Sequence, residues 1–132
     1  DRFESRGLGD VYKRQFPECM NSLLQQRLRQ FLVHSYLYYK LDESIISDTE
    51  YDRICMELRE LLKKHPEADL PFRKIAEKAL GDEASGYSIR QYPPSIISAS
   101  MHLLYQNNYR QQMSFTHFLE RFGARVATES HG

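Results

Sequence analysis

The chain has 132 residues, of which 41% are hydrophobic, and its nine tyrosines and seven phenylalanines supply enough apolar surface for one compact domain with a modest core. The 18 basic and 18 acidic residues give a formal net charge of zero, which argues against direct nucleic-acid binding, because general affinity for nucleic acid depends on neutralising phosphates. The two cysteines form no CxxC pair and no apolar run reaches the length of a membrane span, so we expect a cytoplasmic protein with free thiols, no metal and no membrane partner.

The first fifteen residues, DRFESRGLGDVYKRQ, have no helical or strand periodicity and do not lead into the pattern that follows. The stretch DVYKRQ at residues 10–15 looks like the translation of an adapter used in sequencing libraries. Residues 1–15 are therefore predicted to be a non-native or disordered extension, with a native flexible terminus as the alternative.

Two amphipathic helices are predicted next, at about residues 20–40 and 48–65. Apolar residues recur at intervals of three and four in both, with Pro66 ending the second helix. Either Ser47 or Asp48 caps the second helix, since Glu50 follows at the spacing of a capping box. Helices joined by a short loop pack antiparallel, so a helical hairpin is expected.

Further short helices complete an all-α prediction. One is expected from Pro71 to Leu80 with Gly81 as its stop, and residues 87–94 are expected to form a loop or a short edge strand. Residues 96–105 return to helical spacing, and Ser114 caps a last helix that ends at Gly123. The predicted organisation is a single helical nucleotide-binding domain over residues 16–123, followed by a flexible tail at 124–132.

Side chains that suit nucleotide recognition meet at the loop end of the predicted hairpin. They are Tyr38, Tyr39, Asp48, Tyr51 and Asp52. Tyrosine faces stack on flat rings, and carboxylates at a helix start accept hydrogen bonds from ribose hydroxyls or a carboxamide. Taken singly, Asp48 fits a helix cap equally well, Tyr51 favours the core and Asp52 favours solvent. Their joint spacing with Tyr38 favours ligand binding.

A pyrophosphate would also need cations. Lys40 and Arg53 are near the predicted site in sequence, and Arg90 or Arg110 would reach it if the later helices fold over it. His34 and His102 stand alone and are interpreted as structural.

The stretch YLYYKLDESIISDTEYDRICMELRELLKKHPE, residues 36–67, resembles the N-terminal helical subdomain of NAD-dependent bacterial DNA ligases. The resemblance implies a site for the nicotinamide mononucleotide half of NAD, with contacts at Tyr38, Asp48, Tyr51 and Asp52. Tyr39 departs from the family, which has a histidine there. Ligation in this family requires a nucleotidyltransferase domain with a KxDG lysine, and the chain lacks that motif, so we expect a protein that is not an enzyme and uses no cofactor as a catalyst.

After Ser85 the sequence departs from the ligase order, and the stretch SGYSIRQYPPSIISAS resembles small phage proteins related to ligases. This second resemblance suggests a phage-encoded sponge in the host cytoplasm that sequesters cyclic ADP-ribose type immune signals. The ligand is then nicotinamide mononucleotide, NAD or cyclic ADP-ribose, and a homo-oligomer would enclose it more fully. The alternatives are an accessory or remnant of a ligase that grips nicotinamide mononucleotide, and a protein-binding inhibitor that reuses the fold.

Overall fold

The computed structural model describes residues 6–82 and 85–131, with the surroundings of side chains given for 20–81 and 85–123. These residues form five α-helices and two short π-helical segments and contain no strand, which confirms the all-α prediction. In chain order the elements are α1 Arg6–Ser35, η1 Tyr36–Leu41, α2 Asp48–Lys64, α3 Arg73–Asp82, α4 Pro94–Leu104, η2 Tyr105–Tyr109 and α5 Phe115–His131.

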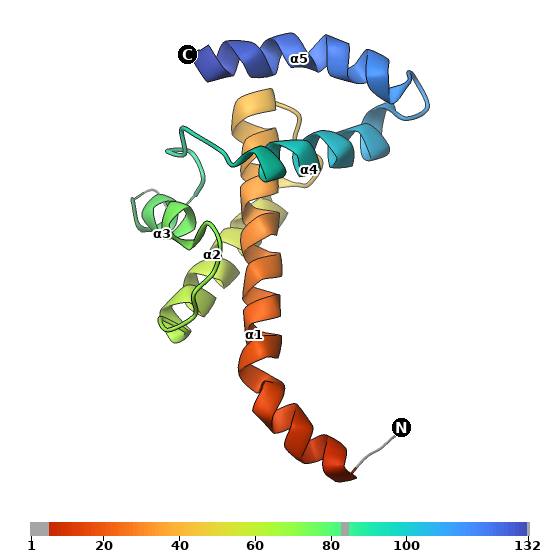
Figure 1. Ribbon diagram of the computed structural model, residues 1–132. Coiled ribbons are helices and arrows are strands. Elements are labelled where there is room, and N and C mark those ends of the chain that lie inside the picture. Colours follow the sequence, from red (N-terminus) through yellow and green to blue (C-terminus); the bar gives the residue numbers. More distant parts are fainter. Residues whose placement is uncertain (1–5, 83–84, 132) are drawn as a thin grey trace.

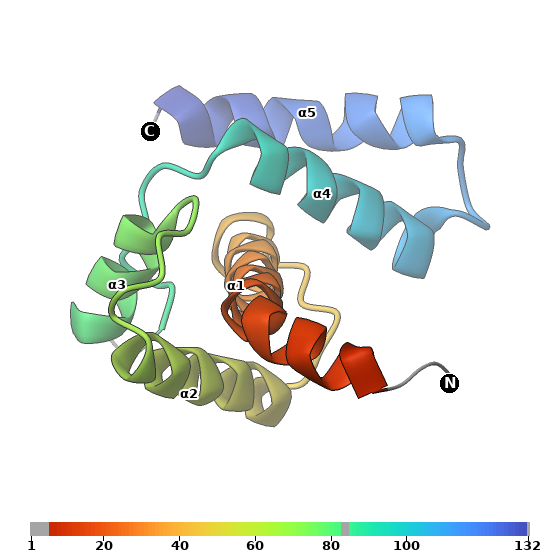
Figure 2. The same ribbon diagram turned by 60° about the horizontal axis from the view of Figure 1, so that its bottom comes forward.

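The long helix α1 stands at the centre of the molecule (Figure 1). Viewed towards its end, α1 lies between α2 and α3 on one side and α4 and α5 on the other (Figure 2). It contacts α2, α3 and α4, while α5 packs on η1 and η2. The side chains that fill the space between these helices are completely buried, and the largest include Leu24, Leu28, Phe31, Leu32, Leu58, Ile96, Leu104 and Phe118.

The predicted hairpin of the first two long helices is present. The apolar residues of α2 that recur at helical spacing are buried against α1, among them Ile54, Leu58 and Leu62. Ser47 is the cap of α2, because its Oγ accepts a hydrogen bond from the Glu50 amide at 3.1 Å. The same cap fixes where α2 begins, and thereby the position of the acidic first turn.

The first helix differs from the prediction at both ends. It begins at Arg6, well before the expected start near residue 20, so the backbone of residues 6–15 continues α1 and is not irregular. Residues 1–5 lie outside the described part of the chain. At the other end the α-helix stops at Ser35, and Tyr36–Leu41 continues with the wider spacing of a π-helix. The Asp42 amide donates to the Leu37 carbonyl there, which is the i→i+5 pattern.

The predicted boundary of the third helix is also corrected. Its helix, α3, begins at Arg73 and not at Pro71, because Phe72 takes a left-handed φ of 66°, which no α-helix accommodates. The Arg73 guanidinium donates to the backbone oxygens of Leu62, His65 and Ala68 at 2.7–2.9 Å. These bonds satisfy carbonyls at and beyond the end of α2 and join the two helices.

Neither glycine predicted to stop a helix does so. Gly81 lies inside α3 and Gly123 inside α5, which runs on to His131. A glycine ends a helix by taking positive φ, and no described glycine has positive φ. Ser114 does cap α5, as predicted, by accepting from the His117 amide at 3.2 Å.

Residues 85–93 form a loop, and α4 then begins at Pro94. Of the two predicted alternatives, a loop or a short edge strand, the loop is confirmed. This loop returns the chain from α3 to the loop end of the hairpin. Within the described residues no helix combines the length and apolar character that crossing a membrane requires.

Candidate functional site

The π-helical segment η1 sets the direction of two of the predicted site residues. Tyr38 and Tyr39 lie in its centre, and both side chains are half-buried. Asp42 ends the segment with a left-handed φ of 57°. An extra residue in a helical turn rotates the following side chains relative to a regular helix, and such turns are frequent at functional sites.

Four tyrosines gather at this end of the hairpin, and we call them the tyrosine cluster: Tyr38, Tyr39, Tyr51 and Tyr87. Tyr39 is at the centre, with ring centroids 4.7 Å from Tyr38, 6.1 Å from Tyr51 and 5.6 Å from Tyr87. All three pairs are edge-to-face, the favourable geometry for aromatic rings. The cluster therefore joins η1, α2 and the loop after α3.

Tyr51 is the buried member of the cluster, with 5% of its surface exposed. Its hydroxyl lies 2.6 Å from the Ser35 Oγ and accepts a hydrogen bond from the Gly86 amide at 2.9 Å. Burial raises the pKa of this hydroxyl far above its ordinary value, so it is neutral at physiological pH. The hydroxyl of Tyr51 is thus hydrogen-bonded inside the protein, which agrees with the expectation that Tyr51, taken singly, is a core residue.

Asp48 and Asp52 follow one another on the first two turns of α2, and both are exposed. The charge of Asp48 raises the pKa of the Tyr38 hydroxyl, together with partial burial, a hydrogen bond to Asp48 and the charge of Asp52. The phenol of Tyr38 therefore lies beside the two carboxylates. Tyr38, Asp48 and Asp52 form the accessible, polar side of the site.

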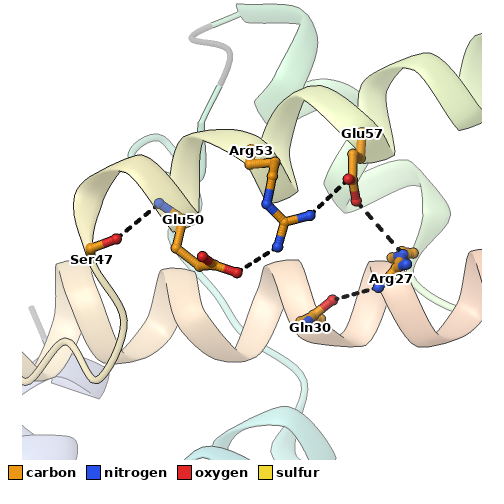
Figure 3. Close-up of polar contacts among 6 residues, drawn as sticks. All are labelled: Arg27, Gln30, Ser47, Glu50, Arg53 and Glu57. Atoms are coloured by element: carbon orange, nitrogen blue, oxygen red, sulfur yellow. Dashed lines mark hydrogen bonds and ion pairs between the residues drawn. The ribbon is translucent and has the colours of Figure 1, made fainter.

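The predicted phosphate contacts are less closely associated with this site. Arg53 donates to Glu57 at 2.8 Å and to Glu50 at 2.5 Å, and Figure 3 shows its guanidinium between these two carboxylates. Charge from both acids raises the already high pKa of Arg53. Two of the five guanidinium donors of Arg53 are thus engaged along α2, and the two carboxylates beside it oppose the approach of an anion.

The other three cations lie on separate elements. Lys40 is half-buried in η1, and Arg90 is exposed in the loop of residues 85–93. Arg110 is exposed after η2 and donates to Gln106 at 3.3 Å.

A groove between α1 and α2 adjoins the site. It has a volume of about 770 Å³ and a mostly apolar lining that includes Leu23, Met56 and Leu61. Its polar lining residues include Thr49 and Asp52, together with Arg27, Arg53 and Glu57 of Figure 3. Asp52 therefore lines the groove and also acts electrostatically on Tyr38. Among the described residues, no three histidine, cysteine or acidic side chains are grouped as metal ligands.

Four residues of this site are absent from the sequence prediction: Ser35, Ser85, Gly86 and Tyr87. A side chain at position 86 would overlap the Ser35 Oγ and come within 3.0 Å of the Tyr51 hydroxyl, so only glycine fits. The partners of Gly86 and Ser85 are 35 and 46 residues away in the chain, and helical periodicity carries no information about such contacts. The glycine within SGYS was the one available signal.

The segment that carries this site is similar to known proteins. Residues 17–71 match the family described as DNA ligase-like, N-terminal NAD+-binding domain. A DNA ligase of Pseudothermotoga lettingae is 41% identical over 69 residues, which cover 50% of this chain and 10% of the ligase. A DNA ligase of Roseiflexus castenholzii is 55% identical over 42 residues, 32% of this chain and 6% of the ligase.

A DNA ligase of Chloroflexus aurantiacus is similar as well, with 38% identity over 65 residues, 49% of this chain and 9% of the ligase. The resemblance to the ligase N-terminal domain is confirmed. The chain spans a tenth or less of the length of these relatives. No solved structure matches the chain significantly.

We call residues 17–71 the ligase-like segment. It contains Tyr38, Tyr39, Asp48, Tyr51 and Asp52, the five predicted ligand contacts. It ends before the loop of residues 85–93, so the fourth ring of the tyrosine cluster lies outside the residues that the family model matches.

Proposed function

We propose that the chain binds a NAD-derived nucleotide and leaves it chemically unchanged. The observation that carries the proposal is the meeting of Tyr38 with Asp48 and Asp52 at the loop end of the hairpin, inside the ligase-like segment. A tyrosine face stacks on a flat ring, and exposed carboxylates accept hydrogen bonds from ribose hydroxyls.

The charges at the site favour a ring and a ribose over a phosphate, and they favour a positively charged ring most. The pyridinium ring of oxidised NAD is a cation, and both tyrosine faces and carboxylates attract cations. A phosphate is repelled by Asp48 and Asp52, and Arg53 is already paired with Glu50 and Glu57. We therefore expect recognition of ring and ribose to dominate over recognition of phosphate.

This expectation has a direct test. Nicotinamide riboside, which lacks the phosphate, should bind within about threefold of nicotinamide mononucleotide, a difference of about 0.7 kcal/mol. If removing the phosphate weakened binding by about 100-fold, about 2.7 kcal/mol, a cation would have to contact it. The preference for ring and ribose would then be wrong.

The absence of turnover is supported by the sequence of the chain, which has no lysine in a KxDG motif. A bound nucleotide should be recovered intact when the protein is denatured by heat. The test is chromatography of the released ligand after prolonged incubation. Appearance of adenylated protein or of free nicotinamide would show that the chain is an enzyme after all.

As the use of this binding we propose sequestration of cyclic ADP-ribose type immune signals by a phage-encoded protein that acts in the host cytoplasm. A homo-oligomer would cover more of the ligand than one small domain does. Mass spectrometry of small molecules released from the purified protein identifies the natural ligand, and light scattering gives the oligomeric state.

The decisive experiment for binding is isothermal titration with NAD, nicotinamide mononucleotide and cyclic ADP-ribose. At least one should bind with a Kd below about 100 μM, equivalent to about −5.5 kcal/mol. A Tyr38→Ala, Asp52→Asn double variant should lose this binding, and Asp69→Asn, an exposed acid in the loop before α3, serves as its charge-matched control. Absence of binding by the folded wild type would falsify the proposal.

The comparisons favour a second candidate, because the three relatives described above are all DNA ligases. The chain would then supply its nicotinamide-gripping module to a ligase in trans. This idea predicts that adding the protein restores adenylation to a ligase from which its own helical subdomain has been deleted. No restoration at saturating protein would count against it.

A further inference from the structure

We infer that Tyr87 is a further ligand-contacting residue of the site, on whose outer face the flat heteroaromatic ring of the bound nucleotide stacks. The inference rests on the proposed nucleotide binding and adds a wall to it from outside the ligase-like segment. Nothing in residues 17–71 contributes this ring.

The first support is exposure combined with position. Tyr87 is 68% exposed. Leaving the apolar surface of such a large side chain in contact with water is unfavourable. Its ring is 5.6 Å from that of Tyr39, at an interplanar angle of 74°. Tyr39 is itself 4.7 Å from Tyr38. The exposed ring of Tyr87 is therefore connected through Tyr39 to Tyr38, which lies beside the carboxylates of α2.

The second support is that the backbone beside Tyr87 is held in place. The Gly86 amide donates to the Tyr51 hydroxyl at 2.9 Å, and the Tyr87 amide donates to the Ser85 Oγ at 3.3 Å. The Tyr39 hydroxyl reaches the same Ser85 oxygen at 3.4 Å. These contacts fix the loop against the hairpin, so an exposed ring is presented from a positioned backbone, which lowers the entropy lost on binding.

The same contacts give Tyr39 a role. The phenol ring of Tyr39 contacts the ring of Tyr87, and its hydroxyl reaches the Ser85 Oγ. Tyr39 is thus a positioning residue for the loop of residues 85–93.

The test is nucleotide binding by three variants at position 87, measured by titration with NAD and nicotinamide mononucleotide. Tyr87→Ala should raise the Kd about tenfold, equivalent to about 1.4 kcal/mol, because stacking on one aromatic ring contributes about 1–3 kcal/mol. Tyr87→Phe should keep the Kd within about twofold, because it keeps the ring. Leu119→Ala is the control, since Leu119 is also an exposed large apolar side chain and lies on α5, outside both the tyrosine cluster and the groove.

Tyr87→Trp supplies an independent readout, because the chain has no other tryptophan. Its fluorescence should change on nucleotide addition with the same Kd as the calorimetric titration. If wild type binds and Tyr87→Ala binds equally well, or if Tyr87→Phe loses binding as Tyr87→Ala does, stacking on Tyr87 is wrong while nucleotide binding stands. If folded wild type binds none of the nucleotides, both the inference and the proposed function fail.

Discussion

The Tyr51 hydroxyl accepts a hydrogen bond from the Gly86 amide at 2.9 Å, across 35 positions of the chain. Tyr51 belongs to the ligase-like segment and Gly86 follows it, so this bond joins that segment to a loop that comes after it in the chain. Ser35 completes the contact from α1 at 2.6 Å. A buried polar contact of this kind positions three elements at once, because each group loses its partner if one element moves.

Replacing Gly86 with alanine should destabilise the protein. The new Cβ would overlap the Ser35 Oγ, which is completely buried, and would force the loop away from Tyr51. Overpacking of this kind costs about 1–3 kcal/mol. The free energy of unfolding from urea denaturation measures the loss. Gly81→Ala is the control, because a Cβ at this exposed helical glycine has nothing within 4 Å.

The control should behave in the opposite way. Alanine in a helix interior is about 0.5–1 kcal/mol more stable than glycine. Gly81 is the last residue but one of α3, so Gly81→Ala should raise the free energy of unfolding by less than this. If Gly86→Ala were as stable as the wild type, the close approach of residue 86 to Ser35 and Tyr51 would be wrong.

Removing the Tyr51 hydroxyl tests the same contact from the other side. Tyr51→Phe leaves the Gly86 amide and the Ser35 hydroxyl without this partner in a buried place, at a cost of about 1–3 kcal/mol. Ser35→Ala added to Tyr51→Phe should cost less than the sum of the two single changes, with a coupling of about 0.5–3 kcal/mol. Additive effects in this double-mutant cycle would contradict a direct contact between the two hydroxyls.

The sequence predicted the hairpin because its information is local. The spacing of Leu24, Leu28 and Phe31 defines a face, and Ser47 with Glu50 defines a helix start. It did not predict η1, because no residue type marks a π turn. Nor did it predict that Gly81 stays inside α3, because a glycine stops a helix only through its backbone angle and is otherwise tolerated there.

The cap of α2 is open to a direct test. Ser47→Ala removes the side-chain acceptor of the Glu50 amide, and losing such a cap costs about 1 kcal/mol. The free energy of unfolding should fall by this amount. Ser98→Ala, at an exposed interior position of α4, should change stability little or raise it, because alanine is the better helix former. Equal effects of the two substitutions would mean that Ser47 does not act as a cap.

The candidate site was only half accessible to sequence reasoning. A local pattern on one hairpin predicted that Tyr38, Asp48 and Asp52 lie together. In the structure the charges of both acids raise the pKa of Tyr38. The sequence left open whether Tyr51 is a core residue or a ligand contact. Both features are present, since its ring contacts Tyr38 while its hydroxyl is hydrogen-bonded in a buried place. Tyr87 could not be foreseen, because its place depends on where the chain returns after α3.

Burial of Cys55 beside Tyr51 predicts a loss of stability at alkaline pH. Burial raises the pKa of the Cys55 thiol to about 11, from an ordinary value of 9.0. The folded state thus holds this proton more tightly than the unfolded state, so the contribution is complete below pH 9 and is lost as the pH rises from 9 to 11. Buried Tyr51, whose pKa is also raised, acts in the same direction.

Urea denaturation at a series of pH values measures this effect. The free energy of unfolding should decline above pH 9, and Cys55→Ala should flatten the decline, although it lowers the overall stability. In a Cys19→Ser background, Cys55 should react slowly with iodoacetamide in the folded protein and rapidly in urea. An equal slope of stability against pH in Cys55→Ala and its parent would show that the thiol does not titrate in this range.

The pair of Tyr38 and Asp48 connects the electrostatics of the site with its binding role. The Asp48 carboxylate raises the pKa of the Tyr38 hydroxyl, so Asp48→Asn should lower that pKa towards its ordinary value of 10.0. Carbon-13 NMR of labelled tyrosine follows the titration of this phenol, with Asp69→Asn as the control. The same substitution should weaken nucleotide binding about tenfold, equivalent to about 1.4 kcal/mol, because an amide accepts a ribose hydrogen bond less strongly than a carboxylate does. An unchanged Tyr38 titration would contradict the proximity of the two residues. If the pKa of Tyr38 fell while the nucleotide affinity stayed the same, Asp48 would lie beside Tyr38 but would only position it. Asp52 would then be the carboxylate that accepts the hydrogen bonds of the ribose.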